Sequence, residues 1–452
     1  MRKLAVLFLT TFLVAGCGSS SDDPVTGPPT ACSNDGQKQF VLDALYDWWL
    51  WNDMLPADRS EINIADYESP FWLVVEVTEF YGPRDAMGEP IDRFSYVDSL
   101  EADQQFFGAG EYEGFGFRWG IEDEQVMRVK GVFPGSPSAA AGFERGHAVV
   151  ALNGRTIADI WATEGVVGIG TITDDNDTID FSVERLDGST YNAVITKDIV
   201  TIIPIPEWRT ISIGDGVPPV GYMQFEAFVS TADPVFDQVF AEFNAAGVND
   251  VIIDMRYNGG GLVDTAELLG DYLGGFANDG LVFSNTEFNA DRAPQYNSTD
   301  RFSRRGNSLD TMRLIVIASG GTASASELVT NSMIPYADVW IVGENTFGKP
   351  VGQVGIDFCT DQILRPTAFR TTNANGDGDY FDGLPVDCPA EDDYTIPVGD
   401  VNDPRLVAAL SVAETGACPV VAAPLGQQLP EIKPQVRYPF MRGSAAREAG
   451  LL

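Results

Sequence analysis

A serine and a lysine stand just after two apolar stretches of sequence, and together they have the chemistry for acyl transfer. Ser324 lies in SGGTASASE and Lys349 in ENTFGKPVGQ, twenty-five residues later. A serine hydroxyl attacks a carbonyl when a base removes its proton, and histidine is the usual base. The chain of 452 residues has one histidine, His147, far upstream of both segments. Lysine is therefore the candidate base.

Each of these residues also has an ordinary structural explanation. Thr322, Ser324 and Ser326 precede a helical pattern, where hydroxyl side chains are common N-caps. A lysine is an exposed cation unless it is buried, and a base at neutral pH needs its pKa lowered from about 10.4 towards 7–8. Desolvation in a closed site supplies such a shift. The catalytic interpretation therefore requires that Lys349 is buried.

A run of three glycines, Gly259 to Gly261 in DMRYNGGGL, follows a buried apolar stretch. Glycine lets the backbone approach a substrate closely and point N–H groups at it. A turn into a helix explains the same run equally well. The glycines are thus candidate donors to an oxyanion only in combination with the serine.

The elements that must position these residues alternate between strand and helix from about Ile202 onward, which predicts α/β units. The segments DVIIDMR, RLIVIAS and DVWIVGE have the unbroken apolar runs of strands covered on both faces. Before the first of these strands, Asp233 is the N-cap and Pro234 the first residue of a predicted helix. Its apolar face comprises Phe236, Val239, Phe240 and Phe243.

Two further regions precede this part of the chain. Residues 37–105 begin with apolar residues at helical spacing, which predicts an N-terminal helical domain; its tryptophans suit core packing, with a ligand platform as the alternative. Residues 111–200 consist of short strand patterns and turns around one helix.

The segment 371–387 carries Asn and Asp side chains. A turn is favoured over a calcium loop, since the twelfth-position Glu of an EF-hand is missing.

The β-rich region resembles a PDZ domain. Ser136 to Gly154 matches a stretch of that family, and the carboxylate-binding loop is matched by four residues, Gly114, Phe115, Gly116 and Phe117. The resemblance implies capture of a C-terminal peptide by strand addition. His147 takes the place of the family's usual Asp after a turn glycine, so it is expected to be a loop residue.

Residues 37–420 as a whole resemble the carboxyl-terminal processing, or tail-specific, serine peptidases. The resemblance implies a multidomain fold, with a helical N-terminal region, a PDZ-like domain at 111–200 and an α/β, crotonase-like Ser-Lys protease core at 201–420. It also implies roles for five residues: Ser324 as nucleophile, Lys349 as base, Gln353 as the residue that orients the lysine, and Gly260 and Ala325 as oxyanion donors. Met255 and Pro350 depart from the family's usual Leu and Gly.

The sequence thus predicts a serine endopeptidase that binds exposed C-termini of polypeptides and needs no metal or cofactor. A catalytically inactive lipoprotein that scaffolds peptides is the first alternative. A serine esterase is the second, although G-x-S-x-G is absent. The net charge of −38 argues against nucleic acid or an anionic membrane surface as a direct partner, and fits a solvated surface, a saline medium or cationic substrates.

The N-terminus predicts export. Residues 1–16 form a positively charged start and an apolar run that is short for a membrane span, and Cys17 follows. This pattern resembles bacterial lipoproteins, which implies a lipid on Cys17 and, with Gly18 next, the periplasmic face of the outer membrane. Residues 17–36 have the composition of a flexible tether. Residues 421–452 are an extension to which the sequence assigns no role.

Four cysteines remain after export: Cys32, Cys359, Cys388 and Cys418. An even number in an oxidising compartment predicts two disulfides with three possible pairings. The first expectation is a local pair, Cys359 with Cys388, and a pair between the ends, Cys32 with Cys418. A zinc site is disfavoured because there is no CxxC and no nearby histidine.

Overall fold

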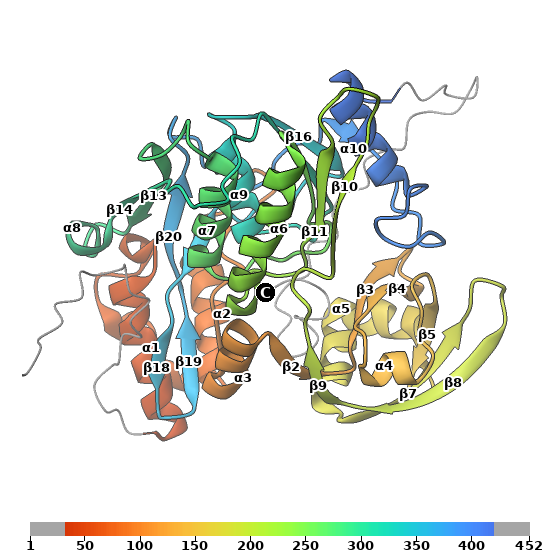
Figure 1. Ribbon diagram of the computed structural model, residues 1–452. Helices are drawn as coiled ribbons and strands as arrows, with labels where there is room; N and C mark the ends of the chain where they lie inside the picture. The colour runs from red at the N-terminus through yellow and green to blue at the C-terminus, as the bar shows by residue number, and fades with distance from the viewer. Residues whose placement is uncertain (1–31, 420–452) are drawn as a thin grey trace, which may run out of the picture.

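The computed structural model describes residues 32–419, which form a mixed α/β fold with more than one hydrophobic core (Figure 1). The signal peptide, Cys17 and residues 421–452 lie outside the described residues. Helix α1 (Asn34–Trp48) begins inside the segment expected to be a tether, with Ser33 as its N-cap. Between residues 32 and 419, none of the helices combines the length and apolar character needed to cross a membrane.

A six-stranded sheet forms the centre of the larger half of the molecule. In spatial order its strands are β10 (Glu207–Ile211), β11 (Val220–Gln224), β12 (Asp250–Asp254), β15 (Arg313–Ala318), β16 (Asp338–Gly343) and β21 (Cys388–Pro389). All neighbours from β11 to β21 are parallel, and β10 is antiparallel to β11. The strands predicted from DVIIDMR, RLIVIAS and DVWIVGE are β12, β15 and β16.

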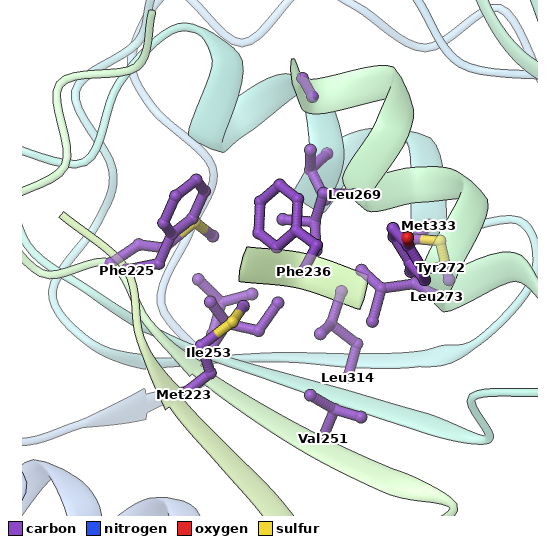
Figure 2. Packing of buried hydrophobic residues seen from close by; sticks show 14 of the residues in the cluster. Met223, Phe225, Phe236, Val251, Ile253, Leu269, Tyr272, Leu273, Leu314 and Met333 are labelled. Carbon is purple, nitrogen blue, oxygen red and sulfur yellow. The ribbon is translucent and has the colours of Figure 1, made fainter. Parts of the chain in front are cut away.

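Helices cover both faces of this sheet, which explains the unbroken apolar runs. Val251 and Ile253 face one core and Ile252 the other, because successive side chains of a strand point to opposite faces. The first core includes Phe236, Leu269 and Met333 (Figure 2). Its helices are α6 (Asp233–Ala246), α7 (Val263–Gly274) and α9 (Ala325–Met333), and α10 (Pro404–Thr415) covers the opposite face.

The N-terminal helices share a core with strands from far along the chain. Helices α1 and α2 (Pro70–Tyr81) pack against a three-stranded sheet whose order is β1 (Tyr96–Ser99), β19 (Gln362–Arg365) and β18 (Ile356–Phe358). Trp48 and Trp49 are buried in this core, as the packing interpretation predicted. The predicted boundary at residue 105 therefore does not separate two independent cores.

Several smaller elements complete this half of the molecule. Helix α3 (Leu100–Gln104) follows β1, and a four-stranded sheet runs beside the helices (Figure 1). Its order is β14 (Ser298–Arg301), β13 (Val282–Phe288), β20 (Thr367–Thr372) and β17 (Val351–Gln353), with α8 (Ala293–Tyr296) between β13 and β14.

The β-rich region is a separate module below the central sheet in Figure 1. Strands β2 (Glu111–Gly114) and β9 (Asp198–Thr201) connect it to the rest. Its own sheet has the order β3 (Phe117–Glu122), β4 (Val126–Val132), β5 (Ala148–Leu152), β7 (Thr178–Glu184) and β8 (Thr190–Thr196), with β6 (Arg155–Thr156) paired to β5. Helices α4 (Pro137–Ala140) and α5 (Ile157–Asp175) belong to the same module.

His147 is a buried loop residue of this module. It precedes β5, and its Nδ1 accepts the Glu144 N–H at 3.2 Å. Burial lowers the pKa of His147, which favours the neutral ring. Its contacts with Glu144 and Tyr191 lie within the module, so they explain its presence structurally.

The expected disulfide pairing is wrong. Cys32 bonds to Cys359 and Cys388 bonds to Cys418. The first bond ties the start of α1 to the turn between β18 and β19, and the second ties the end of α10 to β21. Proximity in sequence misled the prediction, because the segment after Cys359 turns back into β19 and β20 before it reaches Cys388.

Replacing both Cys388 and Cys418 with serine is expected to lower the free energy of unfolding by about 2–4 kcal/mol. The bond closes a loop with a sequence separation of 30, and the unfolded chain gains that freedom when the bond is removed. Thermal unfolding of the variant and the parent, both without reductant, measures the change. An unchanged melting temperature would contradict it.

Candidate active site

Gly260, Ser324 and Lys349 lie on three loops that leave adjacent parallel strands at the same edge of the sheet. In the register, Asp254 of β12 pairs with Ile317 of β15, and Ala318 pairs with Gly343 of β16. Residues 255–262, 319–324 and 344–349 follow these three strand ends. The carboxyl ends of parallel strands are where open α/β sheets bind ligands.

Ser324 stands at the N-cap position of α9 with an unusual backbone conformation. Its φ is 55° and its ψ is −115°, a region that residues with a Cβ rarely adopt. The side chain is half-buried. Such strain persists only where the surroundings enforce it, and it is concentrated at functional sites.

The other two hydroxyls of the segment fasten it to the glycine-rich loop. Thr322 Oγ1 donates to the Met255 carbonyl at 2.7 Å, and Ser326 Oγ donates to the Asn258 carbonyl at 3.0 Å. Both side chains are buried. Of the three candidate N-caps, Thr322 and Ser326 therefore have structural partners that explain them.

Gly260 lies directly against the serine. A Cβ built on Gly260 would be 2.8 Å from Ser324 Cβ and 2.8 Å from Ala325 N, and the φ of Gly260 is 103°. Only glycine fits there. The Gly260 N–H donates to Asn258 Oδ1 at 2.9 Å, so this predicted oxyanion donor is engaged within the protein. The Ala325 N–H belongs to the first turn of α9, where amides have no acceptor inside the helix.

A buried carboxylate that the sequence reasoning missed joins the serine and lysine loops. Glu327 Oε2 accepts the Ser324 N–H at 2.9 Å and the Lys349 N–H at 2.8 Å. Glu327 Oε1 accepts the Gly348 N–H at 2.7 Å and the Thr346 hydroxyl at 2.5 Å. Burial raises the pKa of Glu327 and these donors oppose the rise. All four groups donate hydrogen bonds to the carboxylate, so this arrangement favours the ionised form of Glu327.

A local signal for Glu327 does exist in the sequence. Serine followed three residues later by glutamate is the capping-box pattern, in which the glutamate accepts the N–H of the N-cap residue. That is the bond from Ser324 N to Glu327. The additional bonds to the lysine loop come from tertiary structure.

Lys349 is a buried lysine with a lowered pKa. Its exposed fraction is 8%, and burial lowers its pKa to about 8, while Asp92 and Glu327 oppose the shift. Its Nζ donates to Gln353 Oε1 at 2.8 Å and lies 5.2 Å from the centre of the Phe94 ring. The predicted lysine and glutamine are thus in contact, and the amine is near the range required of a base at neutral pH.

The β-rich module contacts the glycine-rich loop through two arginines. Arg118 of β3 donates to the Tyr257 carbonyl at 2.8 Å and pairs with Glu226 at 3.0 Å. Arg145 donates to the Tyr257 hydroxyl at 2.7 Å and pairs with Asp392. Residues 114–117 of the module precede Arg118 directly. No local pattern in the sequence marks these partners, because they come from distant segments.

Among residues 32–419, no group of three or more His, Cys, Asp and Glu side chains is arranged to hold a metal ion. In the segment 371–387, Asn373 Oδ1 accepts the N–H groups of Asn375 and Asp377 at 2.9 and 3.0 Å. These bonds form a turn, the interpretation favoured from the sequence.

Comparison with known proteins relates this site to one family. Residues 219–387 match the family model described as Peptidase family S41, and this range contains Ser324, Lys349 and Gln353. Among curated proteins, the chloroplastic C-terminal processing peptidase of Tetradesmus obliquus is 26% identical over 249 residues, 52% of this chain and 51% of that protein. A carboxyl-terminal-processing protease of Picosynechococcus sp. is also 26% identical, over 53% of this chain and 55% of its own. The chain thus spans about half the length of these relatives.

Solved structures show the same fold. A protein from Bacteroides fragilis with a provisional S41 protease name superposes with a TM-score of 0.60 at 22% identity, over 83% of this chain and 96% of its own. The photosystem II D1 C-terminal processing protease gives a TM-score of 0.53 at 20% identity, over 86% of this chain and 99% of its own. The chain therefore has the mixed α/β multidomain fold of S41 protease structures.

Glu327→Gln is expected to loosen the serine and lysine loops. The amide places an NH₂ group against N–H donors, and each buried donor left without an acceptor costs about 1–3 kcal/mol. Thermal unfolding and hydrogen exchange at the Gly348 and Lys349 amides measure the loss. Glu287→Gln, which removes a partly exposed partner of Arg370, is the control and should leave that exchange unchanged. Unaltered exchange in Glu327→Gln would show that the carboxylate does not hold the loops.

Proposed function

We propose that this chain is a serine-type endopeptidase in which Ser324 is the nucleophile and Lys349 the general base. One observation carries the proposal: a buried lysine, with its pKa lowered to about 8, shares a carboxylate with a strained serine at the start of a helix. The match to Peptidase family S41 and the curated C-terminal processing relatives support a serine-type protease.

In the proposed reaction, Ser324 Oγ attacks the carbonyl carbon of the scissile peptide while neutral Lys349 takes the hydroxyl proton. The ammonium then gives that proton to the leaving amine, and the C–N bond breaks. Lys349 next takes a proton from the water that attacks the ester carbonyl. It returns this proton to Ser324 Oγ as the acyl C–O bond breaks, which releases the carboxylic acid product and restores the serine hydroxyl. Gln353 keeps the lysine amine in place by accepting from Nζ. These steps use protein groups and water alone, so the proposal includes no cofactor.

The Ala325 N–H is the proposed donor to the oxyanion. The Gly260 N–H is a second donor only after it leaves Asn258 Oδ1. Gly260 is free to make this change because glycine adopts a wide range of backbone angles. Reorientation of this one peptide group is therefore part of the proposed reaction cycle.

We further propose that the module at residues 111–200 is PDZ-like and binds the C-terminal residues of polypeptide substrates through the loop 114–117. Strand β3 stands at one end of the module's sheet order, and a peptide can add to an edge strand as a further strand. Gly116 has a φ of 87°, and a Cβ there would clash with Ser136. We also propose that Cys17 carries a lipid and that the protein lies at the bacterial outer membrane. Residues 1–18 alone support this part of the proposal.

Ser324→Ala and Lys349→Ala are each expected to abolish cleavage of an unstructured protein substrate. The first removes the nucleophile and the second the base, and losing one member of such a pair costs orders of magnitude in kcat. Ser411→Ala is the matched control, since this hydroxyl on α10 donates to the Ala417 carbonyl in the loop after its own helix. Cleavage by Ser324→Ala at the parent's rate would exclude the mechanism.

The parent protein is expected to gain activity as the pH rises through about 8, because only the neutral lysine accepts a proton. Well below that pH, kcat/KM falls about tenfold per pH unit, and above it the rate levels off. Initial rates between pH 5 and 10 measure the profile. A flat profile in the parent, or the same ascending limb in Lys349→Ala, would remove Lys349 as the base.

A further inference from the structure

A second buried carboxylate lies close to the lysine, in the loop that precedes β1. Asp92 has no exposed surface and accepts five hydrogen bonds. Its Oδ1 accepts the N–H groups of Phe94 and Ser95 at 3.0 and 3.1 Å and the Thr367 hydroxyl at 2.9 Å. Its Oδ2 accepts Trp49 Nε1–H and the Ser95 hydroxyl, both at 2.6 Å. Asp92 thus joins the end of α1 to the loop beside Lys349.

We propose that Asp92 is a positioning residue for the lysine base, and that through Asp92 the N-terminal helix α1 sets the orientation of the Lys349 amine. This inference rests on the proposed function, and it assigns the helical region a direct part in that function.

A first series of hydrogen bonds links Asp92 to Gln353. By holding the N–H groups of Phe94 and Ser95, Asp92 fixes the loop that presents the Phe94 carbonyl. That carbonyl accepts Gln353 Nε2–H at 2.6 Å. A carbonyl accepts and cannot donate, so Gln353 must direct its NH₂ group to Phe94 and its oxygen to Lys349. The oxygen then accepts Nζ at 2.8 Å.

The ring of Phe94 covers the same amine. Lys349 Nζ lies 5.2 Å from the ring centre, and the ring packs edge-on against Phe347, two residues before the lysine. A displaced loop would therefore move both the hydrogen-bond partner of Gln353 and the apolar cover of the amine. Both changes would expose Lys349 to water and alter its position.

A second series of contacts links the end of α1 to Asp92 and to β20. Trp49 is fully buried at the C-terminal end of α1, and Leu50 N donates to the Thr367 carbonyl at 2.8 Å. Thr367 in turn pairs with Gln353 in the register of β17 and β20. The end of α1 therefore reaches Gln353 through Asp92 and through β20, which is why helix and base cannot move independently.

Charge gives Asp92 a second effect on the lysine. The charged groups that act on Lys349 are Asp92 and Glu327, which favour the ammonium, and Arg365, which disfavours it. Burial is the largest effect and lowers the pKa of Lys349 to about 8. Removing the Asp92 charge must lower that pKa further.

Three variants test the inference: Asp92→Asn, Trp49→Phe and their combination. Asparagine keeps the size of the side chain but turns an NH₂ group towards the Trp49 N–H, and phenylalanine removes only that donor and part of the ring. Asp271→Asn is the matched control, since this buried carboxylate also accepts a backbone N–H, from Ser303. Each protein is compared by melting temperature, kcat, KM and the pH profile of kcat/KM.

Asp92→Asn is expected to lower kcat by about 10- to 100-fold with little change in KM, as for a displaced catalytic group. Its ascending limb should shift to lower pH. Trp49→Phe should lower kcat less. It should leave the ascending limb of the pH profile at the parent's pH, because the carboxylate charge remains. The combined variant should match Asp92→Asn, since Trp49 acts through Asp92. Asp271→Asn should keep the parent's kcat and pH profile even if it melts earlier.

Two outcomes overturn the inference while the proposed function stands. The first is a parent-like kcat and pH profile in Asp92→Asn when Ser324→Ala is inactive. The second is an effect of Trp49→Phe that adds in full to that of Asp92→Asn. If Asp92→Asn does not fold, Trp49→Phe alone decides, and an unchanged kcat there rejects the proposed action of α1 through Asp92. Full activity of Ser324→Ala would instead reject the proposed function, and the inference with it.

Discussion

The geometry of the candidate site depends on the buried carboxylate of Glu327. A charged group without contact to water is costly unless several donors surround it. Four donors do so here, and they come from two loops: the Ser324 N–H from one, and groups of Thr346, Gly348 and Lys349 from the other. Because the carboxylate needs all of them, the serine and lysine loops can only be placed together.

The parallel sheet makes that arrangement possible. Loops that leave neighbouring parallel strands emerge on the same edge, so a glutamate in the first turn of α9 can reach the loop after β16. Burying both faces of β12, β15 and β16 under helices keeps this edge rigid. The apolar core thus serves the site indirectly, since it fixes the strand ends from which all three loops start.

The sequence predicted what depends on local patterns and missed what depends on contacts between distant segments. The strands β12, β15 and β16 have unbroken apolar runs, and α1 and α6 have apolar residues at helical spacing. The structure contains all five elements where these patterns predict them. The disulfide partners and the core shared by α1 and β18 depend on a chain reversal that no local pattern encodes. Asp92 is a further case, because two of its partners, Trp49 and Thr367, lie far from it in the sequence.

The glycine-rich loop is held from several directions, and this limits how the site can change. Thr322 and Ser326 bind the carbonyls of Met255 and Asn258, and Arg118 of the β-rich module binds that of Tyr257. With these carbonyls fixed, the loop cannot shift as a body. The Gly260 peptide is the part whose backbone angles glycine leaves adjustable, and its N–H is bound by a side chain, not by the sheet. A change at Arg118 therefore acts on the loop that also carries the Gly260 N–H, so the β-rich module and this proposed oxyanion donor are coupled through one loop.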